Sequence, residues 1–156
     1  MKVAITASDA FVAPYIIDAL GDAAVVIPDE ALEDSMTLDV MLTPCNALIH
    51  INSRPVNTTV ARNDREVKIM MREAARPVLD AVNRHGELHM IIVGTLRVHP
   101  PWSPGDDYYG PESSLSPRDT AAEGQLWIEE NALERAESGR PVSVIRASNV
   151  QGVPLG

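Results

Sequence analysis

Residues 1–20 read MKVAITASDAFVAPYIIDAL, a short apolar run followed by a turn and then a helical pattern. Residues 3–6 are apolar and partly β-branched, which predicts a buried strand. Residues 15–20 predict a helix that ends at Gly21, a usual residue just past a helix C-terminus. Pro14 is tolerated in a first helical turn, so the helix begins near it. A strand, a turn and a helix in this order begin a βαβ unit.

The remainder of the chain repeats this alternation. Short β-rich runs predict four more strands, at residues 24–27, 47–51, 90–95 and 142–147. Helical patterns cover residues 64–84 and 120–136, and a weaker one covers residues 30–42. Short strands that alternate with longer helices are typical of a parallel sheet. With 156 residues, of which 45% are hydrophobic, we expect one α/β domain over residues 1–156.

Composition excludes several classes of partner. A net charge of -9 leaves no basic surface to neutralise phosphates, so we expect neither nucleic acid nor membrane as a partner. Cys45 is the only cysteine, which excludes an intrachain disulfide and favours a cytoplasmic location. His85, His89 and His99 lack ligand spacing, so no metal site is expected. Residues 96–117 form a long loop rich in Pro, Gly and acidic residues, which is typical of a binding lid or a disordered segment.

Several segments agree in order and spacing with one family. They are Ala47-Leu48-Ile49-His50, Val78-Leu79-Asp80-Ala81, residues 90–99, and Val144-Ile145-Arg146-Ala147-Ser148-Asn149-Val150-Gln151-Gly152. Together with residues 1–20, these segments resemble the first part of the extended short-chain dehydrogenases/reductases, the NAD-dependent epimerases and dehydratases. The resemblance implies a Rossmann-like, doubly wound parallel sheet flanked by helices, with a ligand crevice at the carboxyl ends of its strands. It also implies that the usual C-terminal substrate lobe is lacking.

The first turn departs from the family pattern T-G-x-x-G-F-x-G. Ala7, Ala10 and Ala13 replace glycines that allow a tight turn, close approach to pyrophosphate and close packing of helix on strand. Asp9, beside Ser8, can cap the helix N-terminus and would then repel a pyrophosphate. We therefore regard residues 7–10 and 13 as a degenerate cofactor loop and expect no cofactor.

Other residues leave cofactor binding open. Asp29 follows the second strand, where the family binds an adenosine ribose. If the altered loop still binds a cofactor, the resemblance implies NAD or NADP.

Catalysis in the family needs a Tyr, a Lys four residues later and a Ser or Thr. Alignment on Glu123 places Leu115 at the tyrosine position and Asp119 at the lysine position, and neither supports acid–base chemistry. Met71 stands in place of the family's asparagine. Thr95 does fall at the Ser/Thr position and is the one candidate catalytic residue.

Polar residues follow several strands and could converge in the crevice. These candidates for ligand contact are Asn52, Arg54, Arg97, His99 and Asn149. Strand-end residues are suitable for binding in an open α/β sheet, although ordinary loop polarity explains each one singly.

The two long predicted helices carry wide apolar arcs. The residues of these arcs are Met70, Met71, Ala74, Ala75, Ala121, Ala122, Leu126, Trp127, Ile128, Ala132 and Leu133. We expect helices 64–84 and 120–136 to form an oligomer, either between copies of this chain or with a full-length family member.

The sequence leaves three functions open. In the first, the chain is a catalytically degenerate family member that acts as a structural, regulatory or partner subunit. Alternatively, it is a working NAD(P)-dependent epimerase, dehydratase or reductase on a sugar nucleotide or related small molecule. A third possibility is a binding or lyase-type domain that uses the vacated crevice.

Overall fold

The computed structural model describes residues 1–6, 10–51, 63–106 and 109–147. In these residues a single sheet has the strand order β2-β1-β3-β4-β5, and every neighbouring pair is parallel. The strands are β1 (Val3–Ile5), β2 (Ala24–Val26), β3 (Ala47–Ile51), β4 (His89–Thr95) and β5 (Val142–Ala147). The predicted parallel α/β sheet is therefore confirmed.

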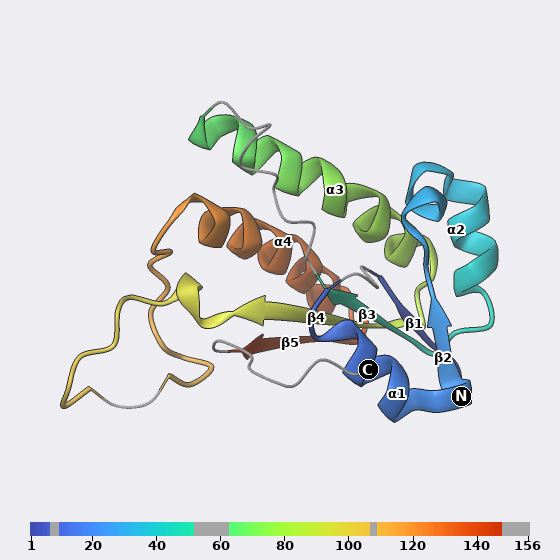
Figure 1. Ribbon diagram of the computed structural model, residues 1–156, viewed down its shortest axis with the longest axis horizontal. Helices are drawn as coiled ribbons and strands as arrows, with labels where there is room; N and C mark the ends of the chain where they lie inside the picture. Colours follow the sequence, from blue (N-terminus) through green and yellow to red (C-terminus); the bar gives the residue numbers. More distant parts are fainter. Residues whose placement is uncertain (7–9, 52–62, 107–108, 148–156) are drawn as a thin grey trace.

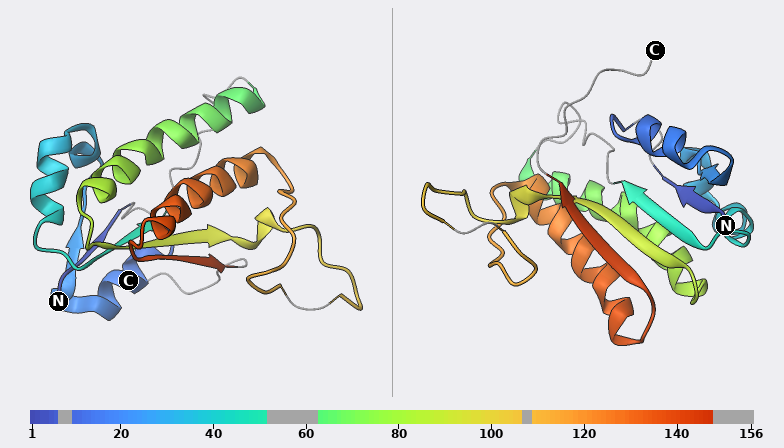
Figure 2. Two further views of the ribbon diagram at one scale, coloured as in Figure 1. Left: turned by 180° about the vertical axis from the view of Figure 1, so that it is seen from behind. Right: turned by 90° about the horizontal axis from the view of Figure 1, so that it is seen from below.

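Helices cover both faces of this sheet. They are α1 (Ala13–Leu20), α2 (Ser35–Leu42), α3 (Asp64–Arg84) and α4 (Thr120–Glu137). Helices α2, α3 and α4 lie on one face and α1 lies on the other (Figures 1 and 2). The chain runs outward from β1 to β2 and then returns past β1 to β3, so the sheet is doubly wound. In such sheets ligands bind where the strand order reverses, outside the carboxyl ends of the strands.

The larger core fills the face below α2, α3 and α4. Leu48, Met90 and Ile92 from the sheet are fully buried there against Val78 and Ile128 of the helices. Helices α3 and α4 run side by side (Figure 1). They pack closely because α4 has a glycine facing α3. A Cβ on Gly124 would lie 2.6 Å from the sulfur of Met71.

A smaller cluster lies between α1 and the opposite face. Ala10 and Ala13 are buried there against Ile5 and Ile51, so both alanine methyls fill the contact between helix and sheet. Helix α1 begins at Ala13, earlier than residue 15, and Val12 occupies its N-cap position. Asp9, which the sequence offers as a cap of this helix, lies outside the described residues.

The weak pattern at residues 30–42 resolves into two elements. A 3₁₀ turn covers Asp29–Glu33, and α2 follows it. Asp34 caps α2 by accepting hydrogen bonds from the amides of Met36 and Thr37. The α-helix therefore covers only the second part of the predicted stretch.

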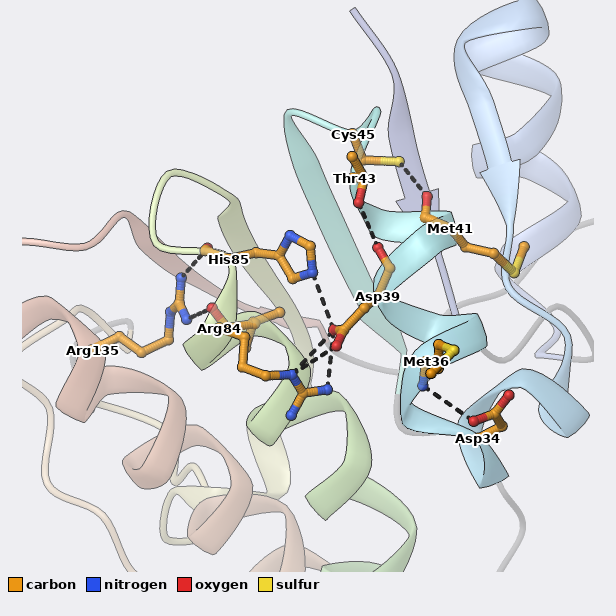
Figure 3. Close-up of polar contacts among 10 residues, drawn as sticks. Asp34, Met36, Asp39, Met41, Thr43, Cys45, Arg84, His85 and Arg135 are labelled. Atoms are coloured by element: carbon orange, nitrogen blue, oxygen red, sulfur yellow. Dashed lines mark hydrogen bonds and ion pairs between the residues drawn. The ribbon is translucent and has the colours of Figure 1, made fainter.

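Asp39 joins α2 to the end of α3 (Figure 3). Its carboxylate accepts bonds from Arg84 Nε at 2.9 Å and Arg84 Nη2 at 3.0 Å, and it lies 3.1 Å from His85 Nε2. The bonds from Arg84, and the contact with His85, keep the pKa of Asp39 below its usual value. The side chains of both Arg84 and Asp39 remain about one third exposed or more.

None of the helices described is long and apolar enough to cross a membrane.

Candidate functional site

A pocket of about 640 Å³ lies at the carboxyl ends of β3, β4 and β5. The first turns of α3 and α4 form its other wall. Described residues that line it are Ile51, Asp64, Val67, Met71, Val93, Gly94, Thr95, Arg97, Asp119, Thr120, Ala121, Ala122, Gln125 and Ala147. We refer to it as the Thr95 pocket.

Thr95 ends β4 at the wall of this pocket. Its Oγ1 accepts a hydrogen bond of 3.2 Å from the amide of Arg97 and so caps a 3₁₀ turn over Leu96–Val98. The guanidinium of Arg97 forms an ion pair with Asp119. Thr95 and Arg97 are thus brought together as the sequence predicted, but each already has a structural contact.

Asp119 is the N-cap of α4. It accepts a 2.9 Å hydrogen bond from the amide of Ala122 as well as the bond from Arg97. Burial acts to raise the pKa of Asp119, but these two hydrogen bonds hold the pKa below its usual value. An ionised carboxylate therefore stands at this wall of the pocket, on the helix terminus that would otherwise attract an anion.

Two other residues with the spacing of the Tyr–Lys pair lie at this pocket. Leu115 precedes α4 and is exposed. Ala121 and Gln125 are four apart on α4, and both line the Thr95 pocket. Ala121 and Gln125 line this pocket together with Asp119, whereas Leu115 does not line it. Neither an alanine nor a glutamine side chain can act as a general acid or base near neutral pH.

His99 lies apart from Thr95 and Arg97. It is buried and lines a second pocket, of about 400 Å³, together with Tyr109 and Arg146. Its Nδ1 is 2.9 Å from the carbonyl oxygen of Ser114, which can only accept, so Nδ1 donates. Its Nε2 then accepts from Arg146 Nη1 at 3.3 Å, and the ring stacks on Tyr109. The expectation that His99 shares one crevice with Arg97 is therefore wrong.

Sequence reasoning missed a buried ion pair between the two pockets. Glu129 of α4 is fully buried, and its Oε2 accepts from Arg146 Nε at 2.9 Å. Its Oε1 lies 3.3 Å from the amide nitrogen of Gln125. A Cβ on Gly94 would overlap with this Oε1. The glycine inside a strand was the available signal, because it often marks a close approach by another group.

His50 of β3 is buried. Its Nδ1 lies 2.8 Å from Thr6 Oγ1, whereas Nε2 has no hydrogen-bond partner among the described residues. Burial without an acidic partner lowers the pKa of His50 from 6.5 to about 4. The imidazole is therefore neutral near neutral pH.

The remaining candidates are placed only in part. Ala7, Ser8, Asp9, Asn52, Arg54 and Asn149 lie outside the described residues. Asp29 is exposed at the start of the 3₁₀ turn after β2. Within residues 1–6, 10–51, 63–106 and 109–147, no three His, Cys, Asp or Glu side chains are grouped so that they could hold a metal ion.

Comparison with known proteins gives structural matches alone. No protein-family model matches the sequence, and no curated protein matches it. RMD from Pseudomonas aeruginosa, solved with NADPH, matches with a TM-score of 0.74 and 17% identity over 96% of this chain and 55% of its own. For dTDP-glucose 4,6-dehydratase from Bacillus anthracis, solved with NAD, the TM-score is 0.71 and the identity 11%, over 94% of this chain and 54% of its own.

A short-chain dehydrogenase/reductase superfamily protein from Agrobacterium tumefaciens, with bound NAD, is also similar. Its TM-score is 0.70 and its identity 19%, over 94% of this chain and 48% of its own. The chain thus spans about half the length of the solved structures it matches. It has the Rossmann-like fold found in one half of the extended short-chain dehydrogenase/reductase structures, the epimerases and dehydratases.

Proposed function

We propose that this chain is a catalytically degenerate epimerase/dehydratase-like protein that acts as a structural, regulatory or partner subunit. The observation that carries the proposal is that Ala121 and Gln125, which have the Tyr–Lys spacing on α4, line the same pocket as Thr95 and carry neither a phenol nor an amine. The described lining of the Thr95 pocket contains no Tyr, Lys, His or Cys. Among the described lining residues, Thr95 therefore has no tyrosine or lysine partner for proton transfer.

The first turn of α1 supports the loss of the cofactor. Ala10 and Ala13 are buried against the sheet, so their methyl groups occupy the contact that the family keeps open with glycine. We expect neither NAD(H) nor NADP(H) to bind to the folded protein.

Calorimetry with millimolar NAD(H) and NADP(H) tests this proposal. We expect no saturable heat. Saturable binding would contradict it and would favour the working-enzyme alternative. A double variant, Ala10→Gly with Ala13→Gly, tests whether the two methyl groups prevent binding. If they do, this variant should bind the dinucleotide.

A partner role requires a surface for assembly, and we propose α3 and α4. Much of the predicted apolar arc is used inside the domain, since Met71, Ile128 and Ala132 are buried. Ile69 and Leu133 remain 40% and 41% exposed on these helices. These two side chains are the best support for contact with a second copy or a related chain.

Light scattering at several concentrations tests this assembly. We expect a dimer or larger oligomer that Ile69→Glu or Leu133→Glu dissociates. Met36→Glu is the matched control, because Met36 is 75% exposed on α2. A strict monomer, or equal effects of all three variants, would contradict the proposal.

A second candidate function is the binding of a small molecule in the Thr95 pocket. The pocket's volume of about 640 Å³ favours it, because that is the size of a typical ligand site. Arg97 would contact the ligand, and His99 would not. A ligand found by thermal-shift screening should bind more weakly to Arg97→Ala, and unchanged affinity would count against this candidate.

A further inference from the structure

A continuous row of polar side chains runs from the Thr95 pocket to the second pocket. It begins with Gln125 in the wall of the Thr95 pocket, passes through buried Glu129 and Arg146, and ends at His99. Each neighbour is within 3.3 Å of the next. Helix α4, strand β5 and the segment after β4 each contribute to this row. We call these four residues the polar row.

The polar row meets the long segment 96–119 at its base. Backbone bonds close that base, from Ser116 N to Val98 O at 2.9 Å and from Arg118 N to Arg97 O at 3.0 Å. The same segment carries Arg97 at the wall of the Thr95 pocket. Figure 2 shows that the described parts of this segment, residues 96–106 and 109–119, extend beyond the sheet and its helices. Contacts near its base are therefore the ones that can fix its direction.

His99, like its neighbour Val98, is buried at this base. It is 1% exposed, and both ring nitrogens are bonded, one within the segment and one to Arg146 of β5. Arg118 completes the base by donating to the carbonyl oxygens of His99 and Pro100. The bond between Arg146 and His99 is thus a side-chain link from the base of the segment to the sheet.

Glu129 determines where Arg146 points. Because Glu129 accepts from Nε, the planar guanidinium is held with Nη1 toward the imidazole. Gly94 leaves the room that this carboxylate needs. Without the carboxylate, Arg146 has other rotamers open to it, and its bond to His99 is no longer fixed.

We propose that Glu129 is a positioning residue which, through Arg146 and His99, latches segment 96–119 to the sheet and so holds Arg97 at the Thr95 pocket. This role goes beyond the proposed function and does not depend on it. The alternative is that hydrogen bonds within the segment hold it in place without any contact to the sheet. If the latch operates, a change at Glu129 loosens residues of the segment to which Glu129 has no described hydrogen bond.

Native-state hydrogen exchange on Glu129→Gln tests the latch. This variant keeps the side chain's shape but removes its charge. We expect the amides of Ser116 and Arg118 to exchange about tenfold faster, the effect of one charge-assisted hydrogen bond. Glu130→Gln is the matched control, because Glu130 is the exposed neighbour on the same helix, and we expect no change there.

Two outcomes would overturn the proposal. One is loop exchange in Glu129→Gln no faster than in Glu130→Gln. The other is equal acceleration of the distant amides of Ile27 and Cys45, which would show a general loss of stability.

A second variant keeps the test valid if Glu129→Gln does not fold. His99→Phe preserves the stacking on Tyr109 and the Glu129–Arg146 pair but removes both imidazole bonds. Because this variant also removes the bond from His99 to Ser114 within the segment, the latch predicts a local acceleration at least as large as in Glu129→Gln. Unchanged exchange at Ser116 and Arg118 would contradict it.

Discussion

Two arginine–carboxylate pairs join neighbouring elements of this fold in different surroundings. Arg146 and Glu129 connect β5 to α4 in the interior, where the Glu129 side chain is fully buried and that of Arg146 is 18% exposed. Arg84 and Asp39 connect α3 to α2 at the surface, where the side chains are 43% and 33% exposed (Figure 3). The distance between the paired atoms is 2.9 Å in both.

Because the two pairs have the same distance, their difference in burial should determine how much each contributes to stability. Water already solvates the charges of an exposed pair, so the pair adds little to stability. A buried pair makes each partner necessary, because removing one leaves an unpaired charge in the interior. We therefore expect the inner pair to control local structure and the outer pair to contribute weakly.

Arg146→Met should have the largest effect. It leaves Glu129 buried without its cation, and we expect a loss of about 3–5 kcal/mol in the free energy of unfolding. Urea denaturation measures it. The matched change Arg84→Met should cost much less. Equal losses of stability in the two variants would contradict the idea that burial determines the contribution of each pair.

Gly94→Ala tests the space around the inner pair. A Cβ at this position overlaps with Glu129, so we expect a loss of about 1–3 kcal/mol from overpacking. Gly86→Ala is the control, because a Cβ there approaches only the side chain of Arg140, at 4.0 Å. Both glycines flank or lie in β4, and the same denaturation experiment compares them. A Gly94→Ala protein as stable as Gly86→Ala would show that the polar row is loosely packed.

His50 should make stability depend on pH. Its pKa falls from 6.5 in the unfolded chain to about 4 in the fold, so below pH 6.5 the unfolded chain binds a proton that the folded chain does not. Stability should drop by about 2 kcal/mol between about pH 7.5 and about pH 5. His50→Asn, which keeps a polar atom near Thr6, should remove this drop, whereas His85→Asn should retain it. If the loss of stability at low pH persists in His50→Asn, other titratable groups cause it.

Asp39→Asn should have the smallest effect, near the resolution of a urea titration. The pKa of Asp39 is lowered in the fold, so its contribution is present above the ordinary carboxyl pKa and is lost as the pH falls through the folded value. The difference between wild type and variant should therefore shrink from about pH 5 to about pH 3. A difference that grows on acidification would contradict the role of Arg84.

The fold was more predictable than the site because its signals are local. Strand β3 and helix α3 have the predicted bounds, since unbroken apolar and amphipathic patterns specify them. The pattern at residues 30–42 was too weak to show the length of α2, although Asp34 is a typical N-cap.

The site depends on contacts between distant residues. His99 joins Ser114 and Arg146 only because the chain folds back on itself, and its spacing from Arg97 gives no hint of this. The same holds for the Thr95 pocket. Alignment on Glu123 did not show that Ala121 and Gln125 line it, because the lining depends on how α4 packs against β4 and α3.

We propose that the Thr95 pocket lacks the cofactor chemistry of the short-chain dehydrogenases/reductases that it resembles. A titration with NADH and NADPH, followed through the backbone amide resonances of Gly94 and Thr95 and the side-chain amide of Gln125, tests it where the chemistry would occur. We predict no saturable shift of these resonances at millimolar nucleotide. Saturable shifts centred on these residues would show a functional cofactor site and contradict the account.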